Sequence, residues 1–453
     1  MSELPKGWVD CKLGDVLTLV NGRAYKKHEM LDTPNSTTPI LRIQNLNGGD
    51  NWFYSDLNLA EDKYCYKGDL LYAWSATFGP YWAKWDKAIF HYHIWNVKPT
   101  KAITLRFAYY TLCNITGAIK SAAHGVAMPH MTKSGMEGWS IKVPSLAEQK
   151  RIVEKLDEVL AQVDTIKARL DGIPALLKRF RQSVLASAVS GKLTEEWRGK
   201  RVDDTSWKLI TLKEAAHIQD PHPSHRTPPV VEGGVPFVSI GDLREDGSID
   251  IENARKVSPD VLKEHNARYT LKEGDFIFGK IGTLGKATVL PIGVDFALSA
   301  NVILIQPEIS LAEPKYIQYF LSSPTTMEEV AKQANSTSQA AFGIKKMRAF
   351  VCRLPKKSEQ KEIVRLVDQY FAFADTIEAQ VKKAQARVDN LTQSILAKAF
   401  RGELVPQDPN DEPADKLLER IVLARKEAEA LAKAAKKAQS TKSTAKKKVA
   451  KSV

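Results

Sequence analysis

Cysteine is scarce in this chain. Four cysteines among 453 residues stand singly, at Cys11, Cys65, Cys113 and Cys352. None has a second cysteine at the short spacing that zinc sites and redox loops require. We therefore expect neither kind of site and place the chain in the reducing cytoplasm.

Long apolar runs are missing as well. No stretch reaches the roughly 18 apolar residues of a membrane-spanning helix. The first ten residues, MSELPKGWVD, are polar and aromatic. They differ from the charged-then-apolar leader of a secreted protein. We expect no membrane insertion and no secretion.

Catalytic motifs are also lacking. A DNA methyltransferase needs an Asn/Asp-Pro-Pro-aromatic loop, and the nearest approach, Asp408-Pro409-Asn410, lacks the second proline and the aromatic residue. The stretch GKIGTLGK from Gly279 resembles a phosphate-binding loop, but it has five residues between Gly279 and Gly285, where that loop has four, and Ala287 replaces the Ser or Thr that holds magnesium. We predict a glycine turn there, and we expect no catalytic residue.

Metal ligands are sparse. His91 and His93 alternate on a predicted strand and share one face, where Cys113 or His124 could join them. No other residues have ligand spacing. We therefore expect no metal site.

The composition itself allows two or three globular domains, since 43% of the 453 residues are hydrophobic. Lysine and arginine number 66 against 53 aspartates and glutamates, giving a net charge of +13. Such an excess is typical of proteins with a polyanionic partner, although many basic proteins have none.

One segment occurs twice. EQKRIVEKLDEVLAQVDTIKARL begins at Glu148, and EQKEIVRLVDQYFAFADTIEAQV begins at Glu359, an offset of 211 residues. Identities continue at this offset as far as Leu193 and Leu404, without a gap. The segment was therefore duplicated.

Apolar residues within each copy step alternately by four and three, which predicts a long helix with one narrow apolar seam. A helix from Glu148 to Ser190 would be roughly 60 Å long. Two equal seams favour pairing of the two helices, although each could instead pack on its own domain. The expected pairing residues are Ile152, Leu156, Val159, Val163, Ile166 and Leu170 in the first copy, and Ile363, Val367, Tyr370, Ile377, Val381 and Val388 in the second.

Gly172 and Pro174 interrupt the first copy, and proline usually kinks a helix. The seam keeps its phase across Pro174. We therefore predict one bent helix and not two separate ones.

The segments ahead of the two helices share a layout. Gly68-Asp69-Leu70-Leu71-Tyr72 corresponds to Gly274-Asp275-Phe276-Ile277-Phe278, and both predict a short strand bounded by glycine turns. We predict an α+β fold: two β-rich domains, each followed by a long helix, with the helices paired as an antiparallel coiled coil of pseudo-twofold symmetry. The predicted divisions are a first domain at 1–145, a first helix at 146–200, a second domain at 201–356, a second helix at 357–405, and a linker, short surface helix and disordered basic tail at 406–453.

Several of these stretches together resemble a known family. Val143 onward reads VPSLAEQKRIVEKLDEVLAQVD, Gln182 onward QSVLASAVSGKLTEEWR, and Leu396 onward LAKAFRGELVPQDPNDEPADKLLERI. These stretches resemble the specificity subunit of type I restriction-modification systems over nearly the whole chain. The second copy differs in having Pro355-Lys356-Lys357-Ser358 ahead of its EQK, which puts equal docking of partners at the two copies in question.

The resemblance implies two target recognition domains that bind an asymmetric bipartite DNA sequence with an unspecified spacer. It implies helices that dock two modification (methyltransferase) subunits, and restriction (translocase and nuclease) subunits that complete the complex. S-adenosylmethionine, ATP and magnesium would bind those partners, and this non-catalytic chain would hold no cofactor. The alternative is a coiled-coil scaffold whose β-rich domains bind proteins or other ligands.

Base-reading side chains are expected on loops, because Arg, Lys, Asn and Gln read base edges while Lys, Arg, Ser and Thr contact phosphates. In the first domain we predict contacts from Arg23, Tyr25, Lys26, Lys27, Arg42, Gln44, Asn45, Asn47, Ser75, Thr77, His124, His130 and Lys133. In the second we predict them from His225, Arg226, Ser239, Asp242, Arg244, Lys280, Thr283, Lys286, Asn335, Ser336, Ser338, Gln339, Lys345 and Lys346. Any single one of these could equally be an ordinary solvated residue.

Overall fold

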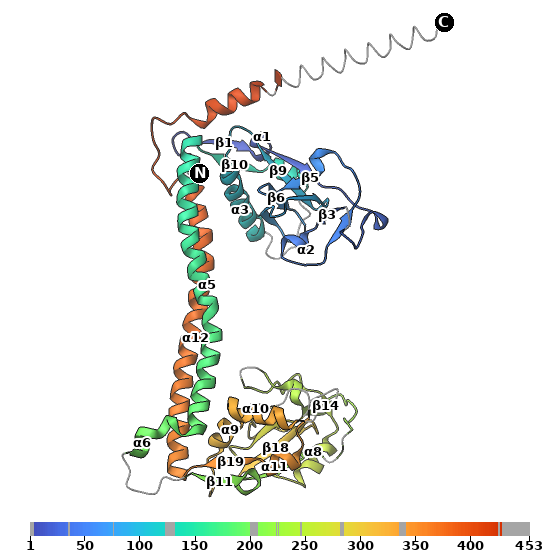
Figure 1. Ribbon diagram of the computed structural model, residues 1–453, viewed down its shortest axis with the longest axis vertical. Helices are drawn as coiled ribbons and strands as arrows, with labels where there is room; N and C mark the ends of the chain where they lie inside the picture. The colour runs from blue at the N-terminus through green and yellow to red at the C-terminus, as the bar shows by residue number, and fades with distance from the viewer. Residues whose placement is uncertain are drawn as a thin grey trace, which may run out of the picture. The chain divides into compact units, whose positions relative to one another are not determined.

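Two long helices, α5 (Leu146–Ser190) and α12 (Lys357–Ala399), occupy the positions of the repeated segment (Figure 1). The computed structural model describes residues 4–34, 37–75, 77–122, 132–199, 207–222, 224, 226–244, 247–280, 285–334, 341–424 and 426–427. The chain divides into a first unit of Met1–Arg169 with Ala384–Val453 and a second unit of Leu170–Lys383. Each unit therefore contains part of both helices and one β-rich domain, called here the first and the second head.

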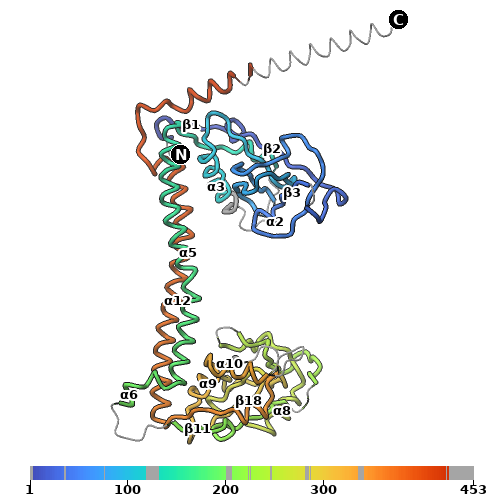
Figure 2. Tube along the Cα trace, viewed as in Figure 1, coloured from blue at the N-terminus to red at the C-terminus, as the bar shows by residue number. Residues whose placement is uncertain are grey.

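The helices pair antiparallel in both units (Figure 2). In the first unit, Lys167 Nζ of α5 lies 2.7 Å from a carboxylate oxygen of Asp389 in α12. In the second unit, Arg181 contacts Asp375 at 2.5 Å, and the rings of Phe180 and Tyr370 lie 6.0 Å apart. Residue numbers rise along α5 as they fall along α12, which confirms the predicted pairing.

Pro174 lies inside an unbroken α5. It removes one backbone hydrogen bond, but the apolar seam continues on its far side, where Leu177 and Val184 are buried. Packing of the seam maintains the helix, and the prediction of one helix in place of two is confirmed.

The seam residues differ in burial. Ile152, Leu156, Val163, Ile363, Val367 and Val381 are buried, and Val159 and Val388 pack at the edge of the first core. Leu170 and Ile377 are half-buried. Ile166 is 46% exposed and Tyr370 is 40% exposed. Two paired helices cover only one side of each seam, so residues away from the heads keep an open flank.

The first head contains two sheets and a strand pair beside α5. Its helices are α1 (Leu13–Val16), α2 (Ile43–Leu46), α3 (Leu105–Ala122) and α4 (Lys133–Glu137). Strand β1 (Val9–Lys12) pairs with β10 (Ser140–Val143). One sheet has the order β2 (Leu17–Asn21), β9 (Ile94–Pro99), β6 (Leu70–Ala73), β7 (Gly79–Trp82), and the other has the order β4 (Phe53–Ser55), β3 (Thr38–Leu41), β8 (Lys87–Phe90), β5 (Tyr64–Tyr66).

The second head repeats this topology, except that its second sheet has three strands in place of four. Strand β11 (Lys208–Thr211) pairs with β19 (Val351–Leu354). One sheet has the order β12 (Ala216–Gln219), β18 (Val302–Pro307), β15 (Phe276–Gly279), β16 (Gly285–Val289). The other sheet has the order β14 (Lys256–Val257), β13 (Val235–Val238), β17 (Ala297–Leu298). Its helices are α7 (Leu212–Ala215), α8 (Pro259–Asn266), α9 (Pro314–Ser322), α10 (Pro324–Gln333) and α11 (Ile344–Ala349). Strands β6 and β15 coincide with the two matching Gly-Asp segments, which confirms the shared layout.

The repeated Glu-Gln pair joins each head to its helix. Gln149 accepts a hydrogen bond from the Thr104 amide and donates to the carbonyl oxygens of Ala102 and Pro144. Gln360 makes the same three bonds, with the Glu313 amide and with Leu311 and Pro355. Both glutamines are fully buried, where unsatisfied amides would cost free energy. This shared role explains why the pair is identical in the two copies.

A second contact is also duplicated about two turns further along each helix. Asp157 of α5 forms an ion pair with Arg106 at 2.8 Å and accepts a hydrogen bond from the Tyr110 hydroxyl, and both partners belong to α3. Asp368 of α12 forms an ion pair with Lys315 at 2.8 Å and accepts a hydrogen bond from the Tyr319 hydroxyl, and both partners belong to α9. Burial alone would raise the pKa of Asp157, but the bonds from Arg106 and Tyr110 outweigh it and hold that pKa below its usual range.

Residues after α12 complete the first unit. Asp411 accepts bonds from Arg151 at 2.7 Å and from the Ser145 hydroxyl at 2.9 Å, and the Ala414 amide donates to the Gly7 carbonyl. Residues 414–424 are helical, as predicted. The expected surface position is wrong for one face of this helix, because Ala414 and Leu418 are buried in the first core. The predicted basic tail lies outside the described residues.

Among the residues that the structure describes, no helix combines the length and the apolar character of a membrane span.

Candidate nucleic-acid interface

In the first head, several predicted contact residues gather where strands end. The loop after β3 begins with Arg42, whose amide donates to Asn45 Oδ1 at 3.1 Å. In this loop, Asn47 Nδ2 donates to the Thr77 hydroxyl at 3.0 Å, which joins it to the turn between β6 and β7. Two groups that lie far apart in the sequence therefore form one polar surface. Ser75 lies in the same turn and is half-buried.

The loop after β3 is held by side chains that were predicted to read bases. Arg42, Gln44 and Asn45 all donate to the Asn51 carbonyl, at 2.8, 2.8 and 3.1 Å. The Arg42 guanidinium also lies over the Phe53 ring, and burial lowers its pKa. Asn45 is only 3% exposed. These bonds assign Asn45 to shaping the loop, whereas Gln44 and Asn47 are exposed.

Arg23 is neutralised within the first head. Its guanidinium binds both carboxylate oxygens of Glu29, at 2.7 and 3.1 Å, and lies over the Tyr25 ring. The Arg23 bond lowers the pKa of Glu29 to about 2. Lys26 and Lys27 are exposed beside this pair. Lys133 belongs to α4, which packs on α1, and it lies 3.5 Å from Glu137. His124 and His130 fall outside the described residues.

The second head places its candidates in matching positions. Ser239 and Asp242 follow β13 as Arg42 and Asn45 follow β3, and the Ser239 amide and hydroxyl both donate to Asp242. Arg244 lies 3.0 Å from Asp250, and Lys280 lies 2.8 Å from Asp220.

The remaining candidates of the second head are dispersed. Arg226 is exposed. Lys345 and Lys346 lie on α11, which packs on α7 as α4 packs on α1. The residues His225, Thr283, Asn335, Ser336, Ser338 and Gln339 lie outside the described residues, as does the side chain of Lys286.

A turn between β8 and β9 was not predicted as part of this surface. His91 and His93 lie in it, and not on one strand face as expected, because residues 92 and 93 form a turn between the two strands. The Tyr92 and His93 rings lie 3.8 Å apart, and Trp74 contacts both. Burial, followed by the charges of His93 and Arg42, lowers the pKa of His91 to about 4. The His91 imidazole is therefore neutral at neutral pH.

Metal ligation finds no support within the described parts of the chain. Among those residues, no three His, Cys, Asp or Glu side chains converge as a metal site would require.

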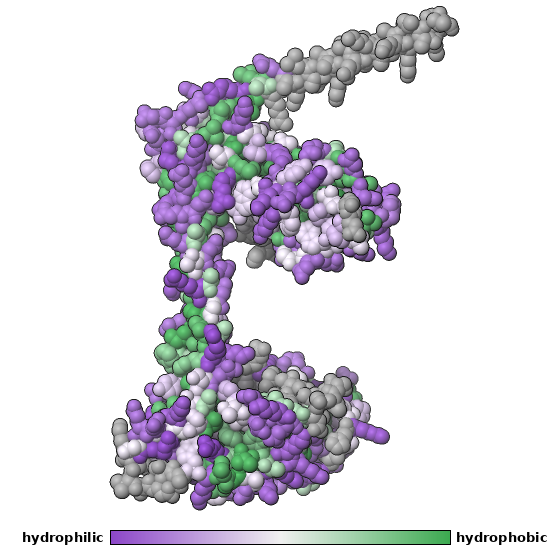
Figure 3. Space-filling model, in the orientation of Figure 1, coloured by the Kyte–Doolittle hydropathy of each residue, from purple (hydrophilic) through white to green (hydrophobic). Residues whose placement is uncertain are grey.

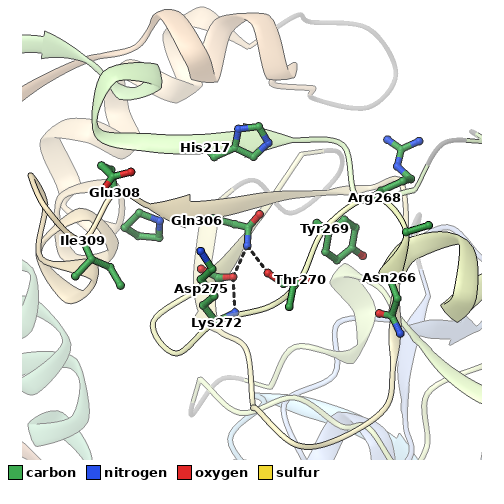
Figure 4. Close-up of a pocket in the computed structure, with 12 residues that line it drawn as sticks. His217, Asn266, Arg268, Tyr269, Thr270, Lys272, Asp275, Gln306, Glu308 and Ile309 are labelled. Atoms are coloured by element: carbon green, nitrogen blue, oxygen red, sulfur yellow. Dashed lines mark hydrogen bonds between the residues drawn. The ribbon is translucent and has the colours of Figure 1, made fainter.

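A cavity of about 730 Å³ opens in the second head (Figure 4). Gln306 donates to Asp275 at 2.5 Å and to the Thr270 carbonyl at 3.0 Å, and the Lys272 amide donates to Asp275. Burial raises the pKa of Asp275 above its usual range. In the first head, the equivalent residue Asp69 accepts hydrogen bonds from Lys98 and Asn96. The duplicated aspartate anchors the strand that follows it, so we assign it a structural role.

The fold and this surface define a class of protein with two β-rich heads of one topology, each joined through a buried Glu-Gln pair to a long helix. The chain belongs to the family described as type I restriction modification DNA specificity domain, whose model matches residues 5–175 and again residues 205–385.

Two named specificity subunits align with almost the whole length of this chain. The type I restriction enzyme EcoKI specificity subunit of Escherichia coli strain K12 is 34% identical over 456 residues, covering 93% of this chain and 96% of that protein. The EcoBI specificity subunit of Escherichia coli is 31% identical over 441 residues, covering 92% of each.

Solved structures share the fold. The HsdS subunit from Thermoanaerobacter tengcongensis superposes with a TM-score of 0.54 at 19% identity, covering 89% of this chain and 98% of that one. A chain from a study of complex assembly and conformational transition of the type I R-M system gives a TM-score of 0.59 at 18% identity, covering 89% and 100%.

Proposed function

We propose that this chain is the DNA-recognition subunit of a type I restriction-modification complex and binds an asymmetric bipartite sequence. One observation carries the proposal: a single scaffold occurs twice, with unlike polar side chains at equivalent loop positions. Arg42 and Asn45 in the first head correspond to Ser239 and Asp242 in the second. Heads with one backbone and different side chains suit two half-sites of different sequence.

The chain itself performs no chemistry in this proposal. Methylation would require S-adenosylmethionine, and cleavage would require ATP and magnesium, all bound by modification and restriction subunits that dock on this chain in the cytoplasm. The named relatives are specificity subunits, which supports this division of roles.

Exposed apolar residues on the paired helices support docking of two modification subunits. They are Ile166 and Leu391 in the first unit, and Leu176, Tyr370 and Phe373 in the second, each at least 40% exposed. Figure 3 shows hydrophobic residues at the surface along these helices. Clustered exposed apolar side chains typically mark protein interfaces.

A salt series separates DNA recognition from a scaffold role. Counterion release makes log K fall against log salt with a slope of about −0.9 per phosphate contact. We expect a slope of roughly −5 or steeper for duplex DNA bound by the full chain with its partner subunits. Fluorescence anisotropy at several salt concentrations measures it.

The matched control ends the chain at residue 427, which removes the basic tail. We expect most of the slope to remain in this shortened chain. A slope near zero in both proteins would instead favour a scaffold with β-rich protein-binding domains.

A further inference from the structure

One turn has the same backbone in both heads but different side chains. In the first head it is the turn of residues 91–93, which follows β8 and reads His-Tyr-His. In the second it is the turn of residues 299–301, which follows β17 and reads Ser-Ala-Asn. The register of the surrounding strands makes them equivalent: Ala73 pairs with Ile94 just beyond the first turn, and Gly279 pairs with Val302 just beyond the second.

Two backbone hydrogen bonds fix each turn in the same way. The His91 amide donates to the Leu41 carbonyl at 2.9 Å, and the Ser299 amide donates to the Val238 carbonyl at 2.8 Å. On the other side, the Trp74 amide donates to the His93 carbonyl at 3.1 Å, and the Lys280 amide donates to the Asn301 carbonyl at 2.9 Å. Because main-chain atoms make these bonds, the turn keeps its position while its side chains vary.

Each turn lies among the polar loops already described. Leu41 directly precedes Arg42, and Trp74 directly precedes Ser75, so the first turn is bonded to the starts of both loops. In the second head, the Ile240 amide donates to Asn301 Oδ1 at 3.4 Å, which joins the turn to the loop containing Ser239 and Asp242. Both turns are therefore directly bonded to the loops of their head's candidate surface.

The side chains of the two turns present different shapes. In the first head, the Tyr92 ring is 40% exposed and is backed by His93 and Trp74, and Trp74 Nε1 donates to the Tyr92 carbonyl at 2.8 Å. In the second head, the turn borders a recess of about 170 Å³, which is lined by His222, Arg226, Thr227, Phe237 and all three turn residues. A ring protrudes at one turn, and hydrogen-bonding groups surround a hollow at the other.

We propose that these two turns are specificity-determining elements, each reading base edges in its own half-site, an inference that rests on the proposed function. Tyr92 and His93 would contact the first half-site, and Asn301 with Thr227 would contact the second. Asn301 suits this role because its Oδ1 accepts hydrogen bonds from the Ser299 hydroxyl and from the Ile240 amide, while its Nδ2 has no partner among the described residues. An oriented amide is the group that pairs with adenine in the major groove.

The test compares DNA selected from a random duplex library by the complete complex containing each variant. Tyr92→Ala keeps the backbone carbonyl that Trp74 binds, and we expect it to change the first sequence block and leave the second unchanged. Asn301→Asp keeps the Oδ1 acceptor but loses the Nδ2 donor. We expect it to reduce discrimination at one position of the second block by roughly 5- to 100-fold, with the first block unchanged.

Tyr66→Ala is the matched control, since Tyr66 is 38% exposed in the same head but lies on β5 and bonds Glu61. We expect it to select the wild-type motif. Thr227→Ala, at an exposed position on the same recess, tests the second head independently if Asn301→Asp lowers the melting temperature.

Four outcomes separate the proposed role of the two turns from the proposed function of the whole chain. Changes confined to the block of the substituted head support the inference. Wild-type motifs from Tyr92→Ala, Asn301→Asp and Thr227→Ala would overturn it, as would equal changes from Tyr66→Ala. Absence of any motif for the wild-type complex would overturn the proposed function itself.

Discussion

Ending the chain at Val405 is expected to destabilise the first unit by about 3–5 kcal/mol, from loss of buried leucine and isoleucine surface and of one partly buried ion pair. The removed segment contributes Leu418 to the first core, with Leu417 and Ile421 at its edge. It also contributes Asp411, whose Arg151 bond lowers the pKa of that carboxyl. The second unit loses nothing, because none of these contacts reaches it.

Amide hydrogen exchange measures this prediction strand by strand. Protection should fall in β2, β6 and β9 of the first head and stay unchanged in β12, β15 and β18 of the second. A chain ending at Glu427 is the matched control, since it keeps Asp411 and Leu418, and its protection should equal that of the full chain. Unchanged protection in the chain ending at Val405 would show that the segment does not stabilise the first unit.

Substitution of the two repeated glutamates is expected to have unequal effects. Glu359 is 2% exposed and accepts bonds from Arg198 at 2.5 Å, Thr194 at 2.7 Å and Trp207 at 3.1 Å. Glu359→Gln would leave the Arg198 guanidinium without its counter-charge, and we expect a loss of about 3 kcal/mol or more.

Glu148 occupies the same position in the first unit, and no arginine in the described part of the chain is bonded to it. Its carboxylate accepts hydrogen bonds from Trp8 Nε1 at 3.0 Å and from Gln407 at 3.5 Å. Burial raises the pKa of this carboxyl. Because the folded state binds this proton more tightly than the unfolded state, the contribution of Glu148 to stability falls as the pH rises through the raised pKa. Glutamine imitates the protonated form, so Glu148→Gln should cost less than about 1 kcal/mol at neutral pH.

Urea unfolding of the two variants beside the unaltered chain tests this difference. The prediction is a clear drop in the unfolding midpoint for Glu359→Gln and a small change for Glu148→Gln. Equal losses would mean that Arg198 does not depend on Glu359 for its charge balance.

The repeat in the sequence was enough to predict the helices, their antiparallel pairing and the common layout of the heads. It succeeded because a long a/d seam and buried residues such as Gln149 and Gln360 have one physical role in both copies. The exposure of Ile166 and Tyr370 was not predictable from the seam, since periodicity gives the face of a helix but not what covers it. The burial of Leu418 depends on a distant core that local patterns do not describe.

The candidate surface was predicted as polar loops, and the structure brings Asn47 together with Thr77 as one surface. The sequence could not show that Asn45 is buried or that Arg23 is bound by Glu29, because both depend on how loops fold back. The turn of residues 91–93 was missed for a related reason. Its histidines were considered only as metal ligands, and their equivalence to Ser299 and Asn301 follows from strand register, since the residues themselves are unlike.

Bipartite DNA recognition is tested by selection from a random duplex library, using this chain in complex with the proposed modification subunits. We predict enrichment of two unlike sequence blocks separated by a spacer of fixed length and free sequence. Recovery of DNA without an enriched motif, or enrichment of a single block, would contradict it.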